Sequence, residues 1–383
     1  MNSDPQATTS TALDEAEDQT RAEPRVVIVT GQPPKPASSQ HDIDHEDFTG
    51  DPDAGDAAPP EVEAVPPPPS TRIIALINQK GGVGKTTSTV NLGAALSHLG
   101  MRVLLIDLDP QAHLTLHLGV DPGELELSNY DLLVDDSVKA IDVVRQVQDN
   151  LWVLPAEVNL AGAETELGPK LITGRAQRVL KDKLEPLLGA RDGGTKGRRN
   201  EGNESANPQS AIRDPQSQTP DSGLRTQDAG PRFDYILIDC PPSLGLLTIN
   251  ALSFAREVFV PMQAHFLALQ GLSKLLETVG FIRQGFNPQL VVSGVILCMH
   301  EKQTLLAAEV TRDLKSFLEG SRDQDVPWRD AVMHTPMIRR NIKLAESPSF
   351  GATIFEYAPD SNGAEDYRAL ALSVAKQSVN VGR

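Results

Sequence analysis

Short apolar runs alternate with amphipathic stretches along most of the chain after residue 70. Runs rich in Val, Ile and Leu predict buried strands at 73–77, 103–106, 151–154, 235–239, 258–261 and 291–299. Apolar residues at helical spacing predict helices at 86–99, 111–118, 131–144, 175–188, 267–284, 305–318 and 364–376. This alternation predicts an α/β fold with a doubly wound, mainly parallel sheet flanked by helices, which binds ligands at the carboxyl ends of its strands.

Two segments break the pattern and set the domain boundaries. Residues 1–70 are rich in Asp, Glu, Pro, Ser and Thr, so we interpret them as a disordered tail. Its apolar patch Val26-Val27-Ile28-Val29 is either a chance cluster or a docking motif. Residues 190–231 hold few large apolar side chains and are predicted to be a disordered insertion. The predicted domain therefore spans 71–378, interrupted by 190–231.

Charge is distributed unevenly over the 383 residues. The net charge is -17, but residues 1–70 hold 15 Asp and Glu against 3 Lys and Arg, so -12 belongs to the tail. The nearly balanced domain can still present one basic face. No run of 18 apolar residues occurs and the acidic N-terminus lacks a signal-like core, so we expect no membrane contact. The two cysteines, Cys240 and Cys298, are interpreted as core thiols in a reducing, cytoplasmic setting.

A glycine-rich turn follows the first predicted strand and precedes the first helix. Glycines let successive N–H groups and the helix N-terminus face an anion. Lys85 adds a positive charge, and the Thr86 hydroxyl is a ligand for Mg²⁺. The turn therefore predicts a binding site for a nucleoside triphosphate, formed by Lys80, Gly81, Gly82, Val83, Gly84, Lys85, Thr86 and Thr87.

Three aspartates end apolar strands. Asp107, Asp109 and Asp239 are expected at the edge of the sheet that carries the glycine-rich turn. We predict a Mg²⁺ site made by Thr86, with waters bridging to Asp107 and Asp239. Asp109 is the candidate that orients or deprotonates the attacking water, and Lys85 neutralises the charge that develops during phosphoryl transfer.

The glycine-rich turn departs from the common phosphate loop at one place. Gln79 stands where the pattern G-x-x-x-x-G-K-[ST] has its first glycine, and Lys80 follows it. In this the chain resembles the deviant Walker A class of P-loop NTPases, which includes the ParA, MinD and nitrogenase iron proteins. In that class the extra lysine reaches across a face-to-face dimer to the partner's nucleotide. The resemblance therefore implies a catalytic role for Lys80 and a homodimer that encloses ATP.

Other segments look specifically like the chromosomal ParA/Soj partition ATPases. The resemblance covers about 71–189 and 232–378. It implies weak, partner-stimulated hydrolysis of ATP to ADP and phosphate, non-specific binding to double-stranded DNA, and a ParB-type centromere-binding partner. It also implies a bacterial, nucleoid-associated protein. The segments that carry it are 78–93, 103–111, Leu160-Ala161-Gly162-Ala163-Glu164, 239–252 and 340–349.

The family's DNA-binding positions are altered in this sequence. Gln303 stands where the family has an arginine, and Lys343 replaces another arginine. Arg340 matches a family arginine, while Arg339 replaces a proline. We predict a phosphate-binding patch because sequence-independent DNA affinity requires only several cations on one face. Its members are Lys302, Arg339, Arg340 and Lys343. The alternative is a solvated basic turn.

Other functions remain as weaker alternatives. One is an ATPase of the same fold that positions a cargo other than DNA on the nucleoid; another is a regulator without enzymatic activity, disfavoured by the intact phosphate loop. The chain end at 370–383 lacks the basic amphipathic helix of a MinD-like protein. The cysteines are not placed for a shared cluster, and no terminal tyrosine cluster marks a tyrosine kinase. His113 and His117 have helical spacing but no third metal ligand nearby.

Overall fold

A single eight-stranded sheet forms the centre of the protein. The computed structural model describes residues 65–171, 174–188, 233–265, 268–301 and 304–377. The strand order is β3-β4-β2-β5-β1-β6-β7-β8, and every neighbouring pair is parallel except β3 and β4. The bounds are β1 Arg72–Leu76, β2 Val103–Asp107, β3 Arg145–Gln148, β4 Leu151–Leu154, β5 Tyr235–Asp239, β6 Glu257–Met262, β7 Val291–Leu297 and β8 Val332–Met333. The predicted fold class is confirmed.

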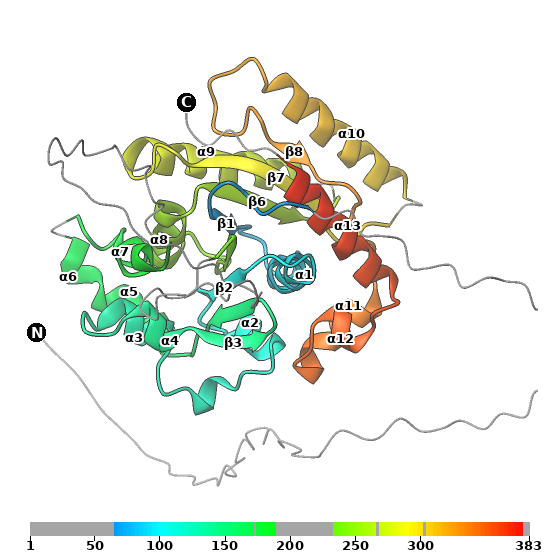
Figure 1. Cartoon of the computed structure of the whole chain (residues 1–383). Helices are drawn as coiled ribbons and strands as arrows, with labels where there is room; N and C mark the ends of the chain where they lie inside the picture. Colours follow the sequence, from blue (N-terminus) through cyan, green and yellow to red (C-terminus); the bar gives the residue numbers. More distant parts are fainter. Residues whose placement is uncertain (1–64, 172–173, 189–232, 266–267, 302–303, 378–383) are drawn as a thin grey trace, which may run out of the picture. The chain divides into compact units, whose positions relative to one another are not determined.

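Helices cover both faces of the sheet (Figure 1). One face carries α1 Lys85–His98, α2 His113–His117, α11 Ile342–Glu346, α12 Ile354–Tyr357 and α13 Asn362–Lys376. The other carries α3 Asn129–Val134, α5 Leu160–Glu166, α7 Val179–Leu184, α8 Leu246–Phe254, α9 Ala268–Gly285 and α10 Leu305–Gly320. The remaining short helices are η1 Pro122–Glu124, α4 Ala140–Val143, α6 Gly168–Leu171, η2 Glu185–Leu188 and η3 Ser347–Phe350.

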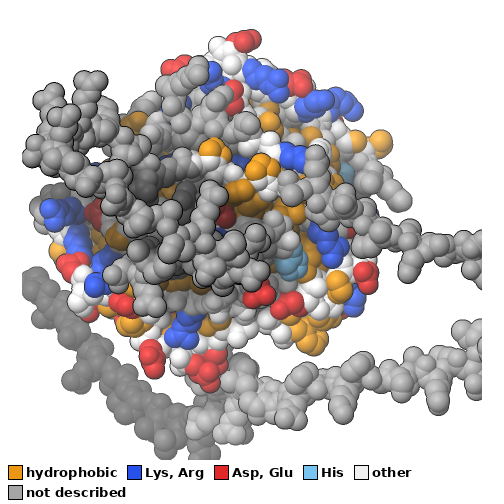
Figure 2. Space-filling view, in the orientation of Figure 1, with side chains coloured by type: hydrophobic (Ala, Val, Ile, Leu, Met, Phe, Trp, Pro, Cys, Tyr) orange, Lys and Arg blue, Asp and Glu red, His pale blue; other side chains and the backbone are white. Residues whose placement is uncertain are grey.

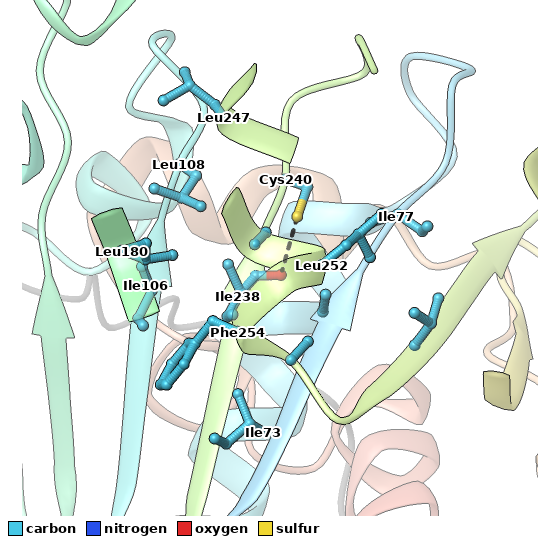
Figure 3. Packing of buried hydrophobic residues seen from close by; sticks show 14 of the residues in the cluster. Ile73, Ile77, Ile106, Leu108, Leu180, Ile238, Cys240, Leu247, Leu252 and Phe254 are labelled. Carbon is cyan, nitrogen blue, oxygen red and sulfur yellow. Dashed lines mark hydrogen bonds between the residues drawn. The ribbon is translucent and has the colours of Figure 1, made fainter. Parts of the chain in front are cut away.

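Alternate residues of each strand enter two separate cores. In β1, Ile73 and Ala75 face the core under α8, whereas Ile74 and Leu76 face the core under α1. This division follows from the two-residue period of a strand and explains why the strand is apolar throughout. Figure 3 shows Ile73, Ile77 and Ile238 packed with Leu252 and Phe254 of α8. The sheet is thereby fixed between two helical layers.

The two cysteines lie in these cores, as the sequence predicted. Cys240 directly follows β5, and its thiol contacts the Ile238 carbonyl at 3.9 Å (Figure 3). Cys298 directly follows β7 and is 2% exposed. Burial raises the pKa of both thiols, to about 11 for Cys298. Both are therefore unreactive packing residues at neutral pH.

The predicted helix at 131–144 is wrong. The structure has α3, a turn, α4 and then β3, an antiparallel edge strand that the sequence analysis missed. Ser128 and Asp131 form a capping box that starts α3 early. The Asp135 carboxylate accepts hydrogen bonds from the N–H and hydroxyl of Ser137, which favours a turn over a continued helix. Farther along, α7 begins at Val179 rather than at 175.

The glycine-rich turn leaves the sheet at its centre. β1 lies between β5 and β6, with Leu76 in register with Asp239 on one side and Phe259 on the other. The carboxyl ends of β1, β2 and β5 therefore meet where this turn begins, which places the predicted site residues near one another. In the part of the chain that the structure describes, no helix is long and apolar enough to cross a membrane. The insertion, Lys302 and almost all of the tail lie outside the described residues.

Candidate functional site

The glycine-rich turn adopts a backbone that only glycine takes easily. Gly82 and Gly84 have φ values of 71° and 93°, in the left-handed region. Gly84 is the N-cap of α1, and its carbonyl accepts the first helical hydrogen bond from the Ser88 N–H at 2.9 Å. A Cβ at Gly84 would lie 3.4 Å from the Cys298 side chain. The turn thus places its N–H groups and the α1 N-terminus at the carboxyl edge of the sheet.

Lys85 and Thr86 occupy the first turn of α1. Lys85 is only 7% exposed. The Thr86 hydroxyl donates to Asp239 Oδ2 at 2.6 Å, so two of the predicted Mg²⁺-site residues contact each other. The Thr89 hydroxyl also approaches Asp239, 3.3 Å from Oδ1. The loop and the end of β5 are therefore joined directly.

Asp107 and Asp239 lie side by side at the ends of β2 and β5. They are in register in neighbouring parallel strands, and both are fully buried. Burial and the Asp107 charge raise the pKa of Asp239 to about 8, while Thr86 and Lys85 oppose that rise. Burial raises the pKa of Asp107 to about 6, against hydrogen bonds from Thr115. Two desolvated carboxylates at one edge form an oxygen-rich setting suited to a hard cation.

Asp107 is held firmly by its surroundings. Its Oδ2 accepts from the Thr115 N–H at 2.9 Å and from the Thr115 hydroxyl at 2.7 Å. Its Oδ1 accepts from the Asp109 N–H at 3.1 Å. Asp109 itself is partly exposed, and its carboxylate accepts from the Gln111 N–H at 3.0 Å. The catalytic role of Asp109 stays a prediction.

Lys80 contacts the segment that follows β6. It is exposed, and its ammonium lies 2.7 Å from His265 Nε2, in the segment after β6. Its backbone N–H donates to Asn78, whose amide donates in turn to the Pro261 carbonyl at 2.8 Å. Gln263 donates to the Gly82 carbonyl at 3.1 Å. The sequence analysis missed these partners because 181 or more positions separate Gln263 and His265 from the loop.

An apolar pocket of about 350 Å³ opens beside the phosphate loop. It lies between the start of α1 and the segment 338–345. Its volume is within the range of small-molecule sites. Met299, in its wall, has a left-handed φ of 51°, a conformation that non-glycine residues rarely adopt. The sequence analysis did not identify it. The lining residues are Gly84, Thr87, Cys298, Met299, Ile338, Arg339, Arg340, Asn341, Ile342, Leu344, Ala345 and Tyr367.

The described members of the predicted basic patch are close in sequence, and each pairs with a carboxylate. Arg339 contacts Asp366 at 2.7 Å and Glu365 at 2.6 Å, and hydrogen bonds from its guanidinium to these carboxylates raise its pKa. Arg340 pairs with Glu301 at 2.9 Å, and Lys343 pairs with Glu346 at 3.0 Å. On the face seen in Figure 2, basic and acidic side chains are interspersed. Of the three, Arg339 is the least available to an outside anion.

The two histidines of α2 differ in burial. His117 is buried, and its Nε2 lies 3.3 Å from the Ser347 hydroxyl. Burial lowers the pKa of His117 to about 4, so it is neutral at pH 7. His113 is exposed on α2. Among the described residues, no group of three or more His, Cys, Asp or Glu side chains is arranged to hold a metal ion.

Comparisons with known proteins agree with this geometry. A family model described as an AAA domain matches residues 71–192 and 225–292. The sporulation initiation inhibitor protein Soj of Bacillus subtilis is 41% identical over 305 residues, which is 79% of this chain and 98% of that protein. The chromosome partitioning protein ParA of Caulobacter vibrioides is 35% identical, over 79% of this chain and 93% of that protein.

A solved structure with bound ADP and magnesium shares the fold. It is the cobyrinic acid a,c-diamide synthase of Mycobacterium smegmatis, 32% identical, with a TM-score of 0.56. The match covers 79% of this chain and 94% of that chain.

Proposed function

Because the chain belongs to the Soj/ParA family of chromosome-partitioning ATPases, we propose that it forms an ATP-dependent homodimer that drives chromosome or plasmid partitioning. In this proposal the dimer binds double-stranded DNA non-specifically, and a ParB-type centromere-binding protein stimulates a weak ATPase. The observation that carries the proposal is that the two lysines of the phosphate loop differ in burial and in the element they contact. Lys85 lies buried at the start of α1, while Lys80 is exposed and turned to another element.

The residues at the sheet edge fit Mg²⁺ and a triphosphate. The positive-φ glycines and the α1 N-terminus provide N–H donors for phosphate oxygens. The Thr86 hydroxyl and the carboxylates of Asp107 and Asp239 provide the hard oxygen ligands that Mg²⁺ prefers, directly or through water. The similar synthase binds ADP and magnesium, which supports this reading. Bound Mg²⁺ supplies charge compensation on the phosphates.

The chain's own residues divide the remaining work. Lys85 sits where it neutralises negative charge on the phosphates. Asp109 follows β2 and is half-buried, and in our proposal it orients or deprotonates the attacking water. The apolar pocket beside Gly84 and Thr87 has the size and the position to receive the base of the nucleotide.

Dimer assembly would follow from the position of Lys80. Its side chain is exposed and lies against His265, so a second protomer that approaches this face can supply a phosphate to it. ATP would then be part of the dimer interface, and binding of ATP would favour the dimer by mass action. Hydrolysis would remove that linkage and return monomers.

DNA binding is assigned to the predicted basic patch near α11. Arg340 and Lys343 are exposed, and their partners are exposed (Glu301) or half-buried (Glu346), so these ion pairs are weak in water and open to replacement by phosphates. Two copies of the patch in a dimer would raise the affinity through joint engagement. This favours nucleoid association of the ATP-bound dimer over that of the monomer.

The proposal is tested by replacing the water-orienting residue. An Asp109→Ala variant should bind ATP, form a stable dimer and release no phosphate, because the loop and the Mg²⁺ ligands are unchanged. Light scattering, phosphate release with and without DNA, and DNA retention at fixed salt are the measurements. A variant that stays monomeric with ATP would exclude the assigned role of Asp109. Addition of a ParB-type protein separates partitioning from the positioning of another cargo.

A further inference from the structure

The contact between Lys80 and His265 specifies the state of the imidazole. The Lys80 ammonium can only donate, so His265 Nε2 must accept, and the ring must be neutral with its proton on Nδ1. At 2.7 Å this is a short, charge-assisted hydrogen bond. It connects the extra lysine of the phosphate loop to the segment between β6 and α9.

Both sides of this contact are fixed by further hydrogen bonds. Asn78 accepts from the Lys80 N–H and donates to the Pro261 carbonyl, which ties the start of the phosphate loop to β6. Gln263, two residues before His265, donates to the Gly82 carbonyl. The phosphate loop thus contacts the segment after β6 at two points, and the residue before the loop, Asn78, contacts β6 itself. The approach of Lys80 to His265 is therefore built into the fold and is not a chance position of a long side chain.

We propose that His265 is a positioning residue that holds Lys80 on its own protomer, and that dimer assembly breaks this hydrogen bond. The inference rests on the proposed function, in which Lys80 serves the partner's nucleotide. An ammonium that donates to His265 is directed back toward its own chain. A partner's phosphate must therefore displace the imidazole, so His265 weakens the dimer and keeps unpartnered protomers apart.

Acidification should release Lys80 in the same way. A small cavity of about 40 Å³ is lined by both side chains, and among the described lining residues Lys80 and His265 are the only titratable groups. The segment after β6 contributes Gln263, and α9 contributes apolar residues such as Leu272 and Leu275. Partial burial and the Lys80 charge lower the pKa of His265. Once protonated, the ring cannot accept, and two positive charges repel each other.

The first test measures the dimer directly. Sedimentation equilibrium with a slowly hydrolysed ATP analogue and Mg²⁺ gives the dimer dissociation constant at pH 7.5. His265→Ala should tighten the dimer by about threefold or more relative to the wild type, because the competing acceptor is gone. His98→Ala, which removes a partly exposed imidazole without a lysine partner, should leave the constant unchanged. A His265→Ala dimer that is equal to or weaker than the wild-type dimer overturns the proposal.

A pH series and a double variant sharpen this test. The wild-type dimer should tighten as the pH falls from 7.5 to 5.5 more than the dimer of His265→Gln, whose amide oxygen accepts from Lys80 but does not titrate in this range. In a Lys80→Ala background, the change at His265 should have no effect on self-association. Equal pH dependence in both proteins, or an effect of His265→Ala without Lys80, contradicts the proposal.

A second measurement needs no dimer. It separates the role proposed for His265 from the proposed function of the whole protein. NMR titration of the His265 ring in nucleotide-free protein should show a higher pKa in Lys80→Ala than in the wild type. An unchanged His265 pKa means that Lys80 is not held there, and the inference fails. If the His265 pKa changes but the wild type never dimerises with the ATP analogue, the proposed function fails while the contact stands.

Discussion

The charged residues at the carboxyl edge of the sheet differ from those near α11 in burial and in support. Asp107, Asp239 and Lys85 are buried, and the scaffold fixes Asp107 through three hydrogen bonds. Arg340 and Lys343 are exposed, and they pair with the exposed Glu301 and the half-buried Glu346 of their own chain. The first group is preorganised before any ligand binds. In the second group each positive charge is already paired with an acid. An anion that binds there must replace Glu301 or Glu346, so its net gain in binding free energy is small.

The largest effect is expected at the preorganised edge. Lys85→Ala should lower nucleotide affinity by about 1,000-fold, about 4 kcal/mol, because a buried charge beside the phosphates is removed. Calorimetric titration with ADP and Mg²⁺ measures this. Lys80→Ala is the matched control on the same loop and should bind ADP as the wild type does. Affinity of Lys85→Ala within tenfold of the wild type would show that this edge is not the phosphate site.

A buried ionisable group away from the site gives the second test. Burial, and then the charge of Arg72, lower the pKa of His334 to about 4 in the folded protein, against 6.5 as its ordinary value. Only the unfolded state then binds a proton between these values, so stability is lost as the pH falls below 6.5. Because of His334, the free energy of unfolding should fall by about 2 kcal/mol between pH 7 and pH 5.

His334→Gln isolates this contribution. Urea unfolding of both proteins at pH 7 and pH 5 gives the difference in the free energy of unfolding at each pH. The wild type should lose about 2 kcal/mol more than the variant over that interval. A difference that does not change with pH would show that His334 is not held neutral by the fold.

The basic patch should respond more weakly and with salt dependence. Arg340→Glu combined with Lys343→Glu should lower the DNA affinity of the ATP-bound dimer at least about tenfold and reduce the salt slope by about 2 per protomer. Arg312→Glu with Lys315→Glu on α10 makes the same charge change elsewhere and serves as the control. DNA retention measured at several salt concentrations compares the two double variants. Equal loss in both double variants would indicate net charge rather than a defined surface.

The smallest expected effect tests the balance of that patch. Glu301→Gln removes the partner of Arg340 and should raise DNA affinity by roughly two- to fivefold at low salt, with little change at high salt. Fluorescence anisotropy with a short duplex measures it. Weaker binding would mean that Glu301 positions Arg340 for the phosphate rather than competing with it.

The sequence was sufficient for the parts of the fold that local chemistry determines. Thr86 and Asp239 meet because a glycine-rich turn and an acid at a strand end must share one edge of a parallel sheet. The prediction of a helix at 131–144 was wrong because the hydrogen bonds from Ser137 to Asp135 favour a turn. Apolar periodicity does not reveal such hydrogen bonds. The sheet also has two strands more than predicted, because β3 and β8 are short edge strands without a strong apolar run.

The rest of the candidate site depends on contacts between distant segments. His265 lies 185 residues from Lys80, and nothing in either neighbourhood indicates that they meet. The pairing of Arg339 with Asp366 is similarly hidden, because the acid lies on α13 and the arginine follows β8. The sequence predicts which residues carry charge. Only the packed structure shows which of those charges are already matched.

The central claim is that Lys80 acts on the nucleotide of a second copy of the chain. The most direct test is the molar mass of wild type and Lys80→Ala, measured by light scattering with a slowly hydrolysed ATP analogue and Mg²⁺, after equal nucleotide binding has been verified for both. We predict a dimer for the wild type and a monomer for Lys80→Ala. A wild type that stays monomeric, or a Lys80→Ala protein that dimerises equally well, would contradict the account.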